Sequence, residues 1–421
     1  MDESAHPLFA ARKRAYSMPL EAINPGAPEL FRTNTFWPFF ERLRAEDPVH
    51  WAVASATDVG GYWSITRYDD IVAVDTDHEA FSSEPVIVLP DPAPDFRLPM
   101  FIAMDPPKHD EQRLTVAPAV SGPILDHLAP LIRERAGAIL DELPIGEEFD
   151  WVDRVSIELT SMTLATLFDF PMQHRRKLSR WSDVATAPPD SLVFAPGRGH
   201  EQRKEELFEC LTWFGQLWNE RVNGPPGRDL ISMLAQGEAT RGMDRMEYLG
   251  NLVLLIVGGN DTTRNTLTGS VLALAENPGQ EALVRARPDL IPAMVSEAIR
   301  WQTPLAYMRR TATRNVELGG KRIRKGDKVA MWYVSGNRDE RVIERPDDFW
   351  IERPRVHQHL SFGFGIHRCV GVRLAELQLK IIWEEILKRF GRIEVTGPPT
   401  YVYSSFVRGY ERLPVVISAR A

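Results

Sequence analysis

The sequence predicts a mainly α-helical protein with a minor β portion, folded as a single domain. From about residue 106 onward, apolar residues recur at helical spacing through most of the 421-residue chain. The 32 prolines are spread along the chain, so no stretch has the composition of an interdomain linker. We therefore expect one domain over residues 1–421, with residues 1–25 as an N-terminal arm.

Composition excludes several classes of protein. A hydrophobic content of 43% and a charged content of 26% argue against disorder, and a net charge of −8 gives no sign of nucleic-acid binding. Two cysteines point to a reducing compartment. Residues 1–25 contain no signal-peptide run, and the strongly apolar run 252–257 is too short to span a bilayer. We expect a soluble, cytoplasmic protein without membrane insertion or a nucleic-acid partner.

The β portion is expected in short pieces, which are separated by irregular segments. Residues 49–53 and 61–66 have the pattern of two strands around the turn-prone residues 58–61. Residues 84–104 form a long loop with five prolines, and a loop of that length is usually functional. Further strands are expected within 316–332, around a Gly-Gly turn, and within 392–418. The segment 341–360 is expected to be irregular, because prolines interrupt it.

The longest predicted helix begins after Asp244 and ends near Asn277, before Pro278. Asp244 is the expected N-cap, with Glu247 as its capping-box partner. A helix of this length is unusual in a globular protein and should cross the core.

The middle of this helix contains the sequence Gly258-Gly259-Asn260-Asp261-Thr262. Two glycines inside a helix destabilise it by about 2 kcal/mol relative to alanine. The Thr262 hydroxyl can bond the Gly258 carbonyl four residues earlier and bend the helix, which would leave a groove beside the Asp261 carboxyl. These residues alone leave open the alternative that the glycines only let another helix pack closely.

Cys369 lies in a glycine-rich stretch, just before residues with helical periodicity. Glycines at 363, 365 and 371 allow sharp turns and close approach to a flat ligand, and a helix N-terminus favours an ionised sulfur. The alternative is an inert, buried cysteine. Because Cys210 is the only other cysteine, a Cys-rich zinc or iron–sulfur site is excluded, and haem is the best-fitting centre.

The stretch 362–375 fully matches the pattern FGxGxHxCxGxxLA and resembles the haem-ligand loop of the cytochrome P-450 monooxygenases, in particular the soluble bacterial type. The resemblance implies a single-domain P-450 fold that holds haem b between the long central helix and the cysteine-loop helix, with Cys369 as the axial iron ligand. It also implies that Asp261 and Thr262 are the acid and the alcohol that deliver protons during oxygen activation.

The resemblance assigns further residues to the cofactor and to the fold. The implied cofactor contacts, including those to the haem propionates, are His109, Arg113, Arg310, His367, Phe362, Gly363 and Gly371. Arg309, next to Arg310, should point elsewhere in an extended strand. Glu297 and Arg300 share a helix face, and with Arg353 they match a buried network that locks the fold.

The implied activity is insertion of one oxygen atom of O2 into an unactivated C–H bond. No flavin- or nicotinamide-binding region is evident, so electrons should come from a separate ferredoxin and its reductase. We expect this acidic partner to dock on the cysteine side, where Lys108, Arg113, Arg368 and Arg373 supply basic groups.

The substrate should be apolar, because the candidate pocket residues are mostly apolar. They are Val86, Ile87, Leu98, Leu255, Gly258, Leu305, Met308 and Phe406. Residues 101–110 and 258–265 resemble the bacterial alkane-hydroxylase branch, which implies terminal hydroxylation of medium-chain alkanes or fatty acids. The alternative is a terpenoid or sterol side-chain hydroxylase, although these usually have Glu in place of Asp261. Two alternatives from other classes are a haem gas sensor and a peroxygenase. The Asp261–Thr262 pair argues against both, because a gas sensor needs no proton relay and a peroxygenase typically lacks the acid–alcohol pair.

Overall fold

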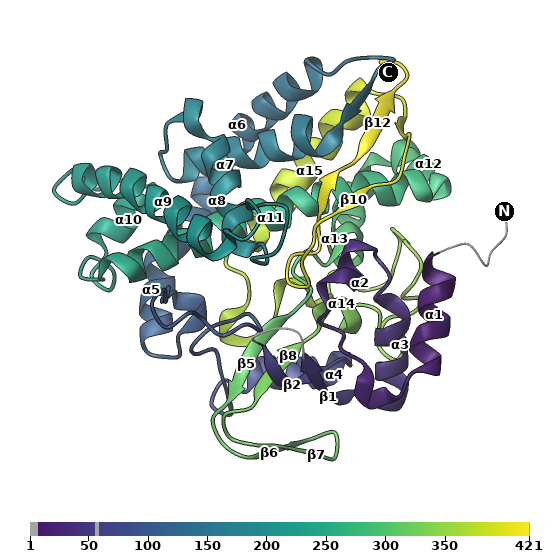
Figure 1. Ribbon diagram of the computed structural model, residues 1–421. Helices are drawn as coiled ribbons and strands as arrows, with labels where there is room; N and C mark the ends of the chain where they lie inside the picture. The colour runs from purple at the N-terminus through teal and green to yellow at the C-terminus, as the bar shows by residue number, and fades with distance from the viewer. Residues whose placement is uncertain (1–6, 55–58, 421) are drawn as a thin grey trace.

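A computed structural model describes residues 7–54 and 59–420 of the chain. It shows a mainly helical protein with small sheets, as predicted. Most helices gather in one part of the molecule, and a mixed sheet lies at the opposite edge (Figure 1). The α-helices are α1 (Pro7–Ser17), α2 (Pro28–Arg32), α3 (Trp37–Glu46), α4 (Tyr68–Thr76), α5 (Lys108–Val116), α6 (Gly122–Asp141), α7 (Glu158–Leu167), α8 (Arg176–Thr186), α9 (Gly199–Arg221), α10 (Leu230–Gln236), α11 (Arg245–Glu276), α12 (Pro278–Ala286), α13 (Ile291–Gln302), α14 (Tyr333–Gly336) and α15 (Val372–Arg389).

The largest sheet has the order β1-β2-β8-β5-β3, in which only the β2–β8 pair is parallel. Its strands are β1 (Val49–Ala54), β2 (Gly60–Ile65), β3 (Phe81–Ser82), β5 (Met308–Ala312) and β8 (Lys328–Met331). The smaller sheets contain β4 (Glu148–Asp150), β9 (Ile393–Val395) and β12 (Pro414–Ile417); β6 (Val316–Leu318) and β7 (Lys321–Ile323); and β10 (Thr400–Tyr401) and β11 (Tyr410–Arg412).

These strands confirm the predicted β segments. The β1–β2 hairpin pairs Val49 with Ile65 and Ala54 with Gly60, so two residues of the predicted turn 58–61 belong to β2, and residue 58 lies outside the described residues. Gly319 and Gly320 have φ values of 57° and 73° in the β6–β7 turn, a conformation that glycine adopts without strain. Residues 341–359 contain neither helix nor strand, as predicted.

Helix α11 extends through the main hydrophobic core and packs against α7, α8, α13 and α15. Its predicted N-cap is confirmed, because the Asp244 carboxylate accepts hydrogen bonds from the backbone N–H groups of Met246 and Glu247 at 2.8 and 2.9 Å. The predicted capping box is wrong. The Glu247 carboxylate instead binds the side chains of Lys108 and Gln112 on α5, and so joins the two helices.

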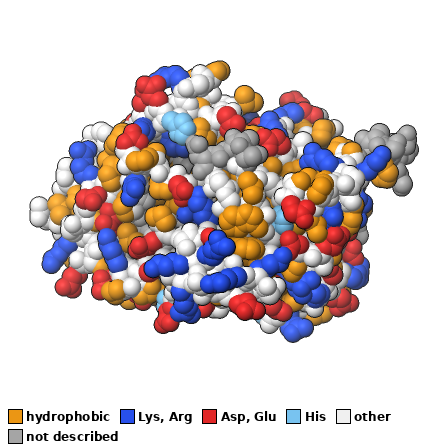
Figure 2. Space-filling model, turned by 60° about the horizontal axis from the view of Figure 1, so that its bottom comes forward, with side chains coloured by type: hydrophobic (Ala, Val, Ile, Leu, Met, Phe, Trp, Pro, Cys, Tyr) orange, Lys and Arg blue, Asp and Glu red, His pale blue; other side chains and the backbone are white. Residues whose placement is uncertain are grey.

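The described part of the N-terminal arm is folded onto the body of the protein. Helix α1 packs on α3, and Ala15 and Ile23 are buried. No described helix has the length and hydropathy needed to cross a bilayer. On the face shown in Figure 2, acidic and basic side chains are interspersed with hydrophobic ones.

Candidate active site

A cavity of about 1680 Å³ lies between α11, the 84–104 loop and the loop that precedes α15. It exceeds the usual range for small-ligand pockets, about 300–1,000 Å³, and is therefore large enough for a cofactor together with a substrate. Cys369 and Thr262 both line it. So do all eight candidate pocket residues, which come from four separate parts of the sequence.

Cys369 is positioned by the tight loop before α15. The Phe362 carbonyl accepts a 2.8 Å hydrogen bond from the backbone N–H of Cys369. Gly363 and Gly365 have φ values of 66° and 64°, which confirms that the loop needs glycine at these two positions. Gly371 differs from them. It is the N-cap of α15 with a φ of −89°, so the expectation of a glycine-specific turn there is wrong.

The thiol of Cys369 lies before a helix N-terminus, as predicted, but its ionisation does not follow the expectation. The thiol is exposed to the cavity, yet desolvation by the surrounding protein raises its pKa, and the Gly371 N–H and the charges of Arg113 and Arg368 only partly oppose this effect. The pKa of the thiol is raised and not lowered, because desolvation outweighs the effect of the helix N-terminus. In the described residues, no cluster of three or more His, Cys, Asp or Glu side chains could hold a metal ion, so Cys369 is not part of such a cluster.

The two glycines of α11 have different roles. A Cβ atom at Gly259 would lie 2.6 Å from Leu164 of α7, so this glycine permits close helix packing. A Cβ at Gly258 would meet no atom within 4 Å, and Gly258 lines the cavity. The Thr262 hydroxyl donates a 2.7 Å hydrogen bond to the Gly258 carbonyl, as the spacing predicted. The packing interpretation therefore holds for Gly259, while Gly258 and Thr262 border the cavity and the Asp261 carboxyl does not line it.

Asp261 is buried behind Thr262 in a cluster of polar groups. Its carboxylate accepts a 2.8 Å hydrogen bond from Nη2 of Arg264, and the same nitrogen donates at 2.8 Å to Asp183 of α8. Desolvation raises the pKa of Asp261 to about 6; Arg264 opposes the rise and Asp183 adds to it. A carboxyl group with a pKa near neutrality can exchange protons at the pH at which most enzymes work.

Two histidines that line the cavity carry unpaired polar atoms. The rings of His109 and His367 lie 4.1 Å apart, and burial lowers the pKa of both, that of His367 to about 2. Nε2 of His109 and Nδ1 of His367 are buried without a hydrogen-bond partner in the described structure. Such orphaned atoms are rare unless a ligand or water satisfies them. Together with Arg113 in the same wall, they fit the acidic side groups of a haem.

Arg310 also lines the cavity, but its charge is already balanced by Asp75. The Asp75 carboxylate accepts hydrogen bonds at 2.8 Å from Arg310, from the Tyr333 hydroxyl and from the backbone N–H of Phe364. Asp75 thus joins α4, β5 and the cysteine loop. Asp75 was not predicted from the sequence, although a carboxylate on the apolar face of α4 that contains Ile71 was a usable signal. Arg309 points elsewhere, toward Asp91, as predicted.

Glu297, Arg300 and Arg353 form a buried ion network outside the cavity. Arg300 contacts both Glu297 oxygens at 2.8 Å, and Nε of Arg353 lies 3.1 Å from one of them. The backbone N–H of Trp350 also donates to Glu297 at 2.8 Å. The carboxylate is therefore fully hydrogen-bonded, and it ties α13 to the irregular segment 341–359.

Two of the four basic residues predicted to dock a ferredoxin already have partners within the protein. Lys108 lies 2.9 Å from Glu247, and the Arg113 guanidinium donates to the carbonyl of Arg368. The side chains of Arg368 and Arg373 are exposed.

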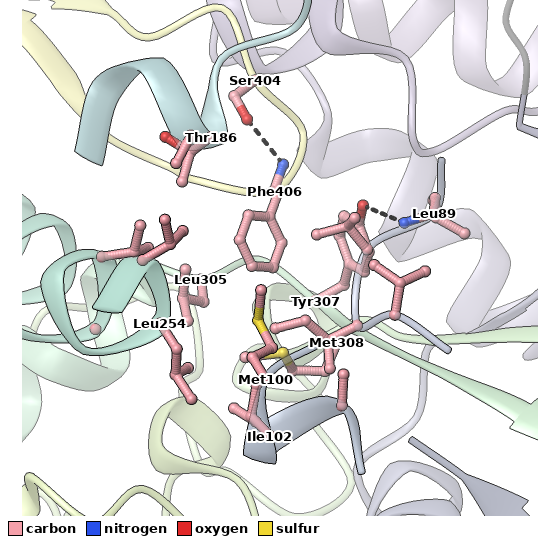
Figure 3. Close-up of a pocket in the computed structure, with 18 of the residues that line it drawn as sticks. Leu89, Met100, Ile102, Thr186, Leu254, Leu305, Tyr307, Met308, Ser404 and Phe406 are labelled. Atoms are coloured by element: carbon pink, nitrogen blue, oxygen red, sulfur yellow. Dashed lines mark hydrogen bonds between the residues drawn. The ribbon is translucent and has the colours of Figure 1, made fainter. Parts of the chain in front are cut away.

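Figure 3 shows apolar side chains from several elements converging on the outer part of the cavity. Phe406 points into its centre, toward Met308 and Met100, and its backbone N–H donates to Ser404 Oγ at 3.1 Å. Leu254 of α11 flanks this space, and Thr186 stands above it. Helix α9 contributes a part of the wall that was not predicted from the sequence, namely His200, Arg203, Lys204 and Leu207.

Comparison with known proteins identifies the family. Residues 218–402 match the family model described as Cytochrome P450. The chain is 35% identical to "Linalool 8-monooxygenase" of Pseudomonas putida over 402 residues, covering 93% of this chain and 97% of that protein. The chain belongs to the cytochrome P450 family.

Two solved P450 structures have the same fold as this P450. "CYP153D17 from Sphingomonas sp. PAMC 26605" is 47% identical, with a TM-score of 0.87 over 93% of this chain and 98% of that one. "Cytochrome P450-153 from Novosphingobium aromaticivorans" is 43% identical, with a TM-score of 0.86 over 94% and 99%. The protein is accordingly a haem-iron monooxygenase of the P450 type.

Proposed function

We propose that this P450 hydroxylates the terminal carbon of medium-chain alkanes or fatty acids. The observation that carries the proposal is the largely apolar cavity that connects the 84–104 loop with Cys369 and Thr262. Such a lining favours an apolar ligand through the hydrophobic effect. The resemblance of residues 101–110 and 258–265 to alkane hydroxylases supports a chain-like substrate.

The roles of the site residues follow from their positions. Haem b, held through Cys369, would supply the oxygen-activating chemistry. Thr262 borders the cavity, and its hydroxyl would be the group that donates a proton to the reacting centre. Asp261 lies behind it and replaces that proton, and its pKa of about 6 suits repeated exchange. Arg264 holds the Asp261 carboxyl in place.

Similarity to the linalool monooxygenase favours a second candidate, hydroxylation of a terpenoid. Both substrate classes are apolar, so the character of the lining does not separate them.

Product analysis tests the two candidates. The haem-loaded protein is supplied with a ferredoxin, its reductase and NADH, and is given octane, decanoate or linalool. We expect octan-1-ol and 10-hydroxydecanoate as main products. Oxidation of linalool alone would overturn the proposal in favour of the terpenoid candidate, and oxidation only at internal carbons would overturn terminal hydroxylation.

We also propose that electrons arrive from a separate ferredoxin, served by its reductase, that docks at Arg368 and Arg373. Charge reversal, Arg368→Glu or Arg373→Glu, should slow electron transfer and weaken its dependence on salt. Lys380→Glu on the same helix is the matched control, because Lys380 is exposed and does not line the cavity. Unchanged transfer rates in the arginine variants would refute this docking site.

A further inference from the structure

One face of α9 forms part of the cavity wall. Arg203, Lys204 and Leu207 follow His200 by three, four and seven residues, so all four lie on the same side of the helix. Leu207 is buried and His200 is exposed. This face therefore extends from the apolar interior to the mouth of the cavity, and its charged residues lie toward the mouth.

The Arg203 guanidinium is held rigidly in this wall. Nε donates a 3.1 Å hydrogen bond to the Val184 carbonyl, and Nη2 donates to the carbonyl of Ala187. These carbonyls are at the C-terminal end of α8, where backbone acceptors have no partner within the helix. The guanidinium also stacks on Phe194, 5.4 Å from the ring centre. Nη1 makes no hydrogen bond to any residue that the structure describes.

The charge of Arg203 is not balanced by any described carboxylate. Burial lowers the pKa of its guanidinium, and no nearby anion opposes this effect. The other cavity-facing groups near the mouth do not balance it. Lys204 is paired with Asp95, Arg97 and His200 are themselves basic, and Asp190 lies beside Tyr403, whose pKa it helps to raise. A half-buried cation without a counter-ion is unfavourable unless a ligand supplies the opposite charge.

We propose that Arg203 binds the carboxylate of a fatty acid whose methyl end reaches toward Thr262 and Cys369. This inference rests on the proposed function and narrows its substrate class from alkanes or fatty acids to fatty acids. Nη1 is the free donor, and a charge-assisted hydrogen bond from it would fix the polar end of the chain. A chain fixed at its carboxylate presents its far end to the reacting centre, which favours attack on the terminal carbon.

A purely structural role makes a different prediction. If Arg203 only caps α8, its removal weakens the cavity wall for every ligand. If it binds the carboxylate, its removal affects acids alone. Substrates with the same chain and different end groups therefore separate the two roles.

Binding is measured with the haem-loaded protein by the ligand-induced shift of the haem absorption, using decanoate, decan-1-ol and decane. Arg203→Met keeps the length of the side chain and removes its charge, and Arg203→Lys keeps the charge. Arg198→Met is the matched control, because Arg198 precedes the same helix, is paired with Glu201 and Glu205, and lies outside the cavity wall.

We expect Arg203→Met to weaken decanoate binding about 10- to 100-fold, as loss of one hydrogen bond to a charged group predicts. Binding of decane and decan-1-ol should stay within about twofold of wild type, which is the usual scatter between independent effects. Arg203→Lys should recover most of the loss, and Arg198→Met should show none.

Equal weakening for all three ligands, or unchanged decanoate binding, would overturn the inference. If wild-type protein binds decane but not decanoate, the inference fails, while the proposed terminal hydroxylation of alkanes stands. If it binds none of the three, the proposed function fails as well.

Discussion

Asp183→Asn should lower the pKa of Asp261 and shift the pH profile of the reaction to more acidic values. Asp183 and Asp261 accept hydrogen bonds from the same Arg264 nitrogen, each at 2.8 Å. The Asp183 carboxylate thus repels the deprotonated form of Asp261 and competes with it for Arg264. Because both effects raise the pKa of Asp261, removal of the Asp183 charge should lower it.

The size of this shift follows from the geometry. Two acceptors that share one donor at 2.8 Å lie no more than about 6 Å apart, so the two charges interact by about 3 kcal/mol at an effective dielectric constant of about 20. That energy corresponds to about two pKa units. The Asp183 side chain is 35% exposed, and solvent screening reduces the expected shift to about one unit.

The assay is the fraction of electrons recovered as hydroxylated product, measured between about pH 5 and pH 8, the range that brackets the Asp261 pKa of about 6. Proton delivery should weaken as pH rises through the pKa of Asp261, because less of the acid form remains. In Asp183→Asn this decline should begin about one pH unit lower. Asp153→Asn removes another partly exposed carboxylate that is paired with an arginine, Arg176, and should leave the profile unchanged. An upward shift in Asp183→Asn, or none, would refute the reasoning.

Four other substitutions test the site and the fold. Cys369→Ser should abolish both activity and the absorption band of thiolate-ligated haem in the reduced, CO-treated protein; retention of both would refute the ligand. Gly259→Ala should destabilise the protein by up to about 2 kcal/mol because its Cβ meets Leu164. Gly258→Ala, whose Cβ meets no atom within 4 Å, should stabilise the protein by up to about 1 kcal/mol. Thermal unfolding compares the two variants, and equal effects would contradict the packing of Gly259 against Leu164. Glu297→Gln should lower the free energy of unfolding in urea by about 3–5 kcal/mol, because two buried arginines lose their counter-ion; a change below about 1 kcal/mol would make the network dispensable.

Features determined by neighbouring residues could be predicted from the sequence. The ends of α11, the Thr262 hydrogen bond and the glycine turn of β6–β7 depend on residues within a few positions of one another. The cysteine loop was identified for the same reason. Local patterns also placed Asp244 as an N-cap correctly.

Features that depend on distant partners could not be predicted. Glu247 has the spacing of a capping box, but α5 brings Lys108 and Gln112 to it across more than a hundred residues. Asp75 meets Arg310 and the cysteine loop only after the chain has folded. The thiol pKa was misjudged because desolvation by the surrounding protein, which no local pattern reveals, opposes the helix terminus.

Two arginines hold α8 at adjacent residues, and the difference between them bears on which one can serve a ligand. Arg264 binds Asp183 through a carboxylate, while Arg203 binds the next residue, Val184, through its carbonyl. A carboxylate neutralises its partner, and a carbonyl satisfies a hydrogen bond but leaves the charge. The charge of Arg264 is therefore used within the protein to hold the acid, and that of Arg203 remains available at the cavity. The same helix thus separates the arginine beside the proposed proton-delivery acid from the arginine proposed to bind an anionic substrate.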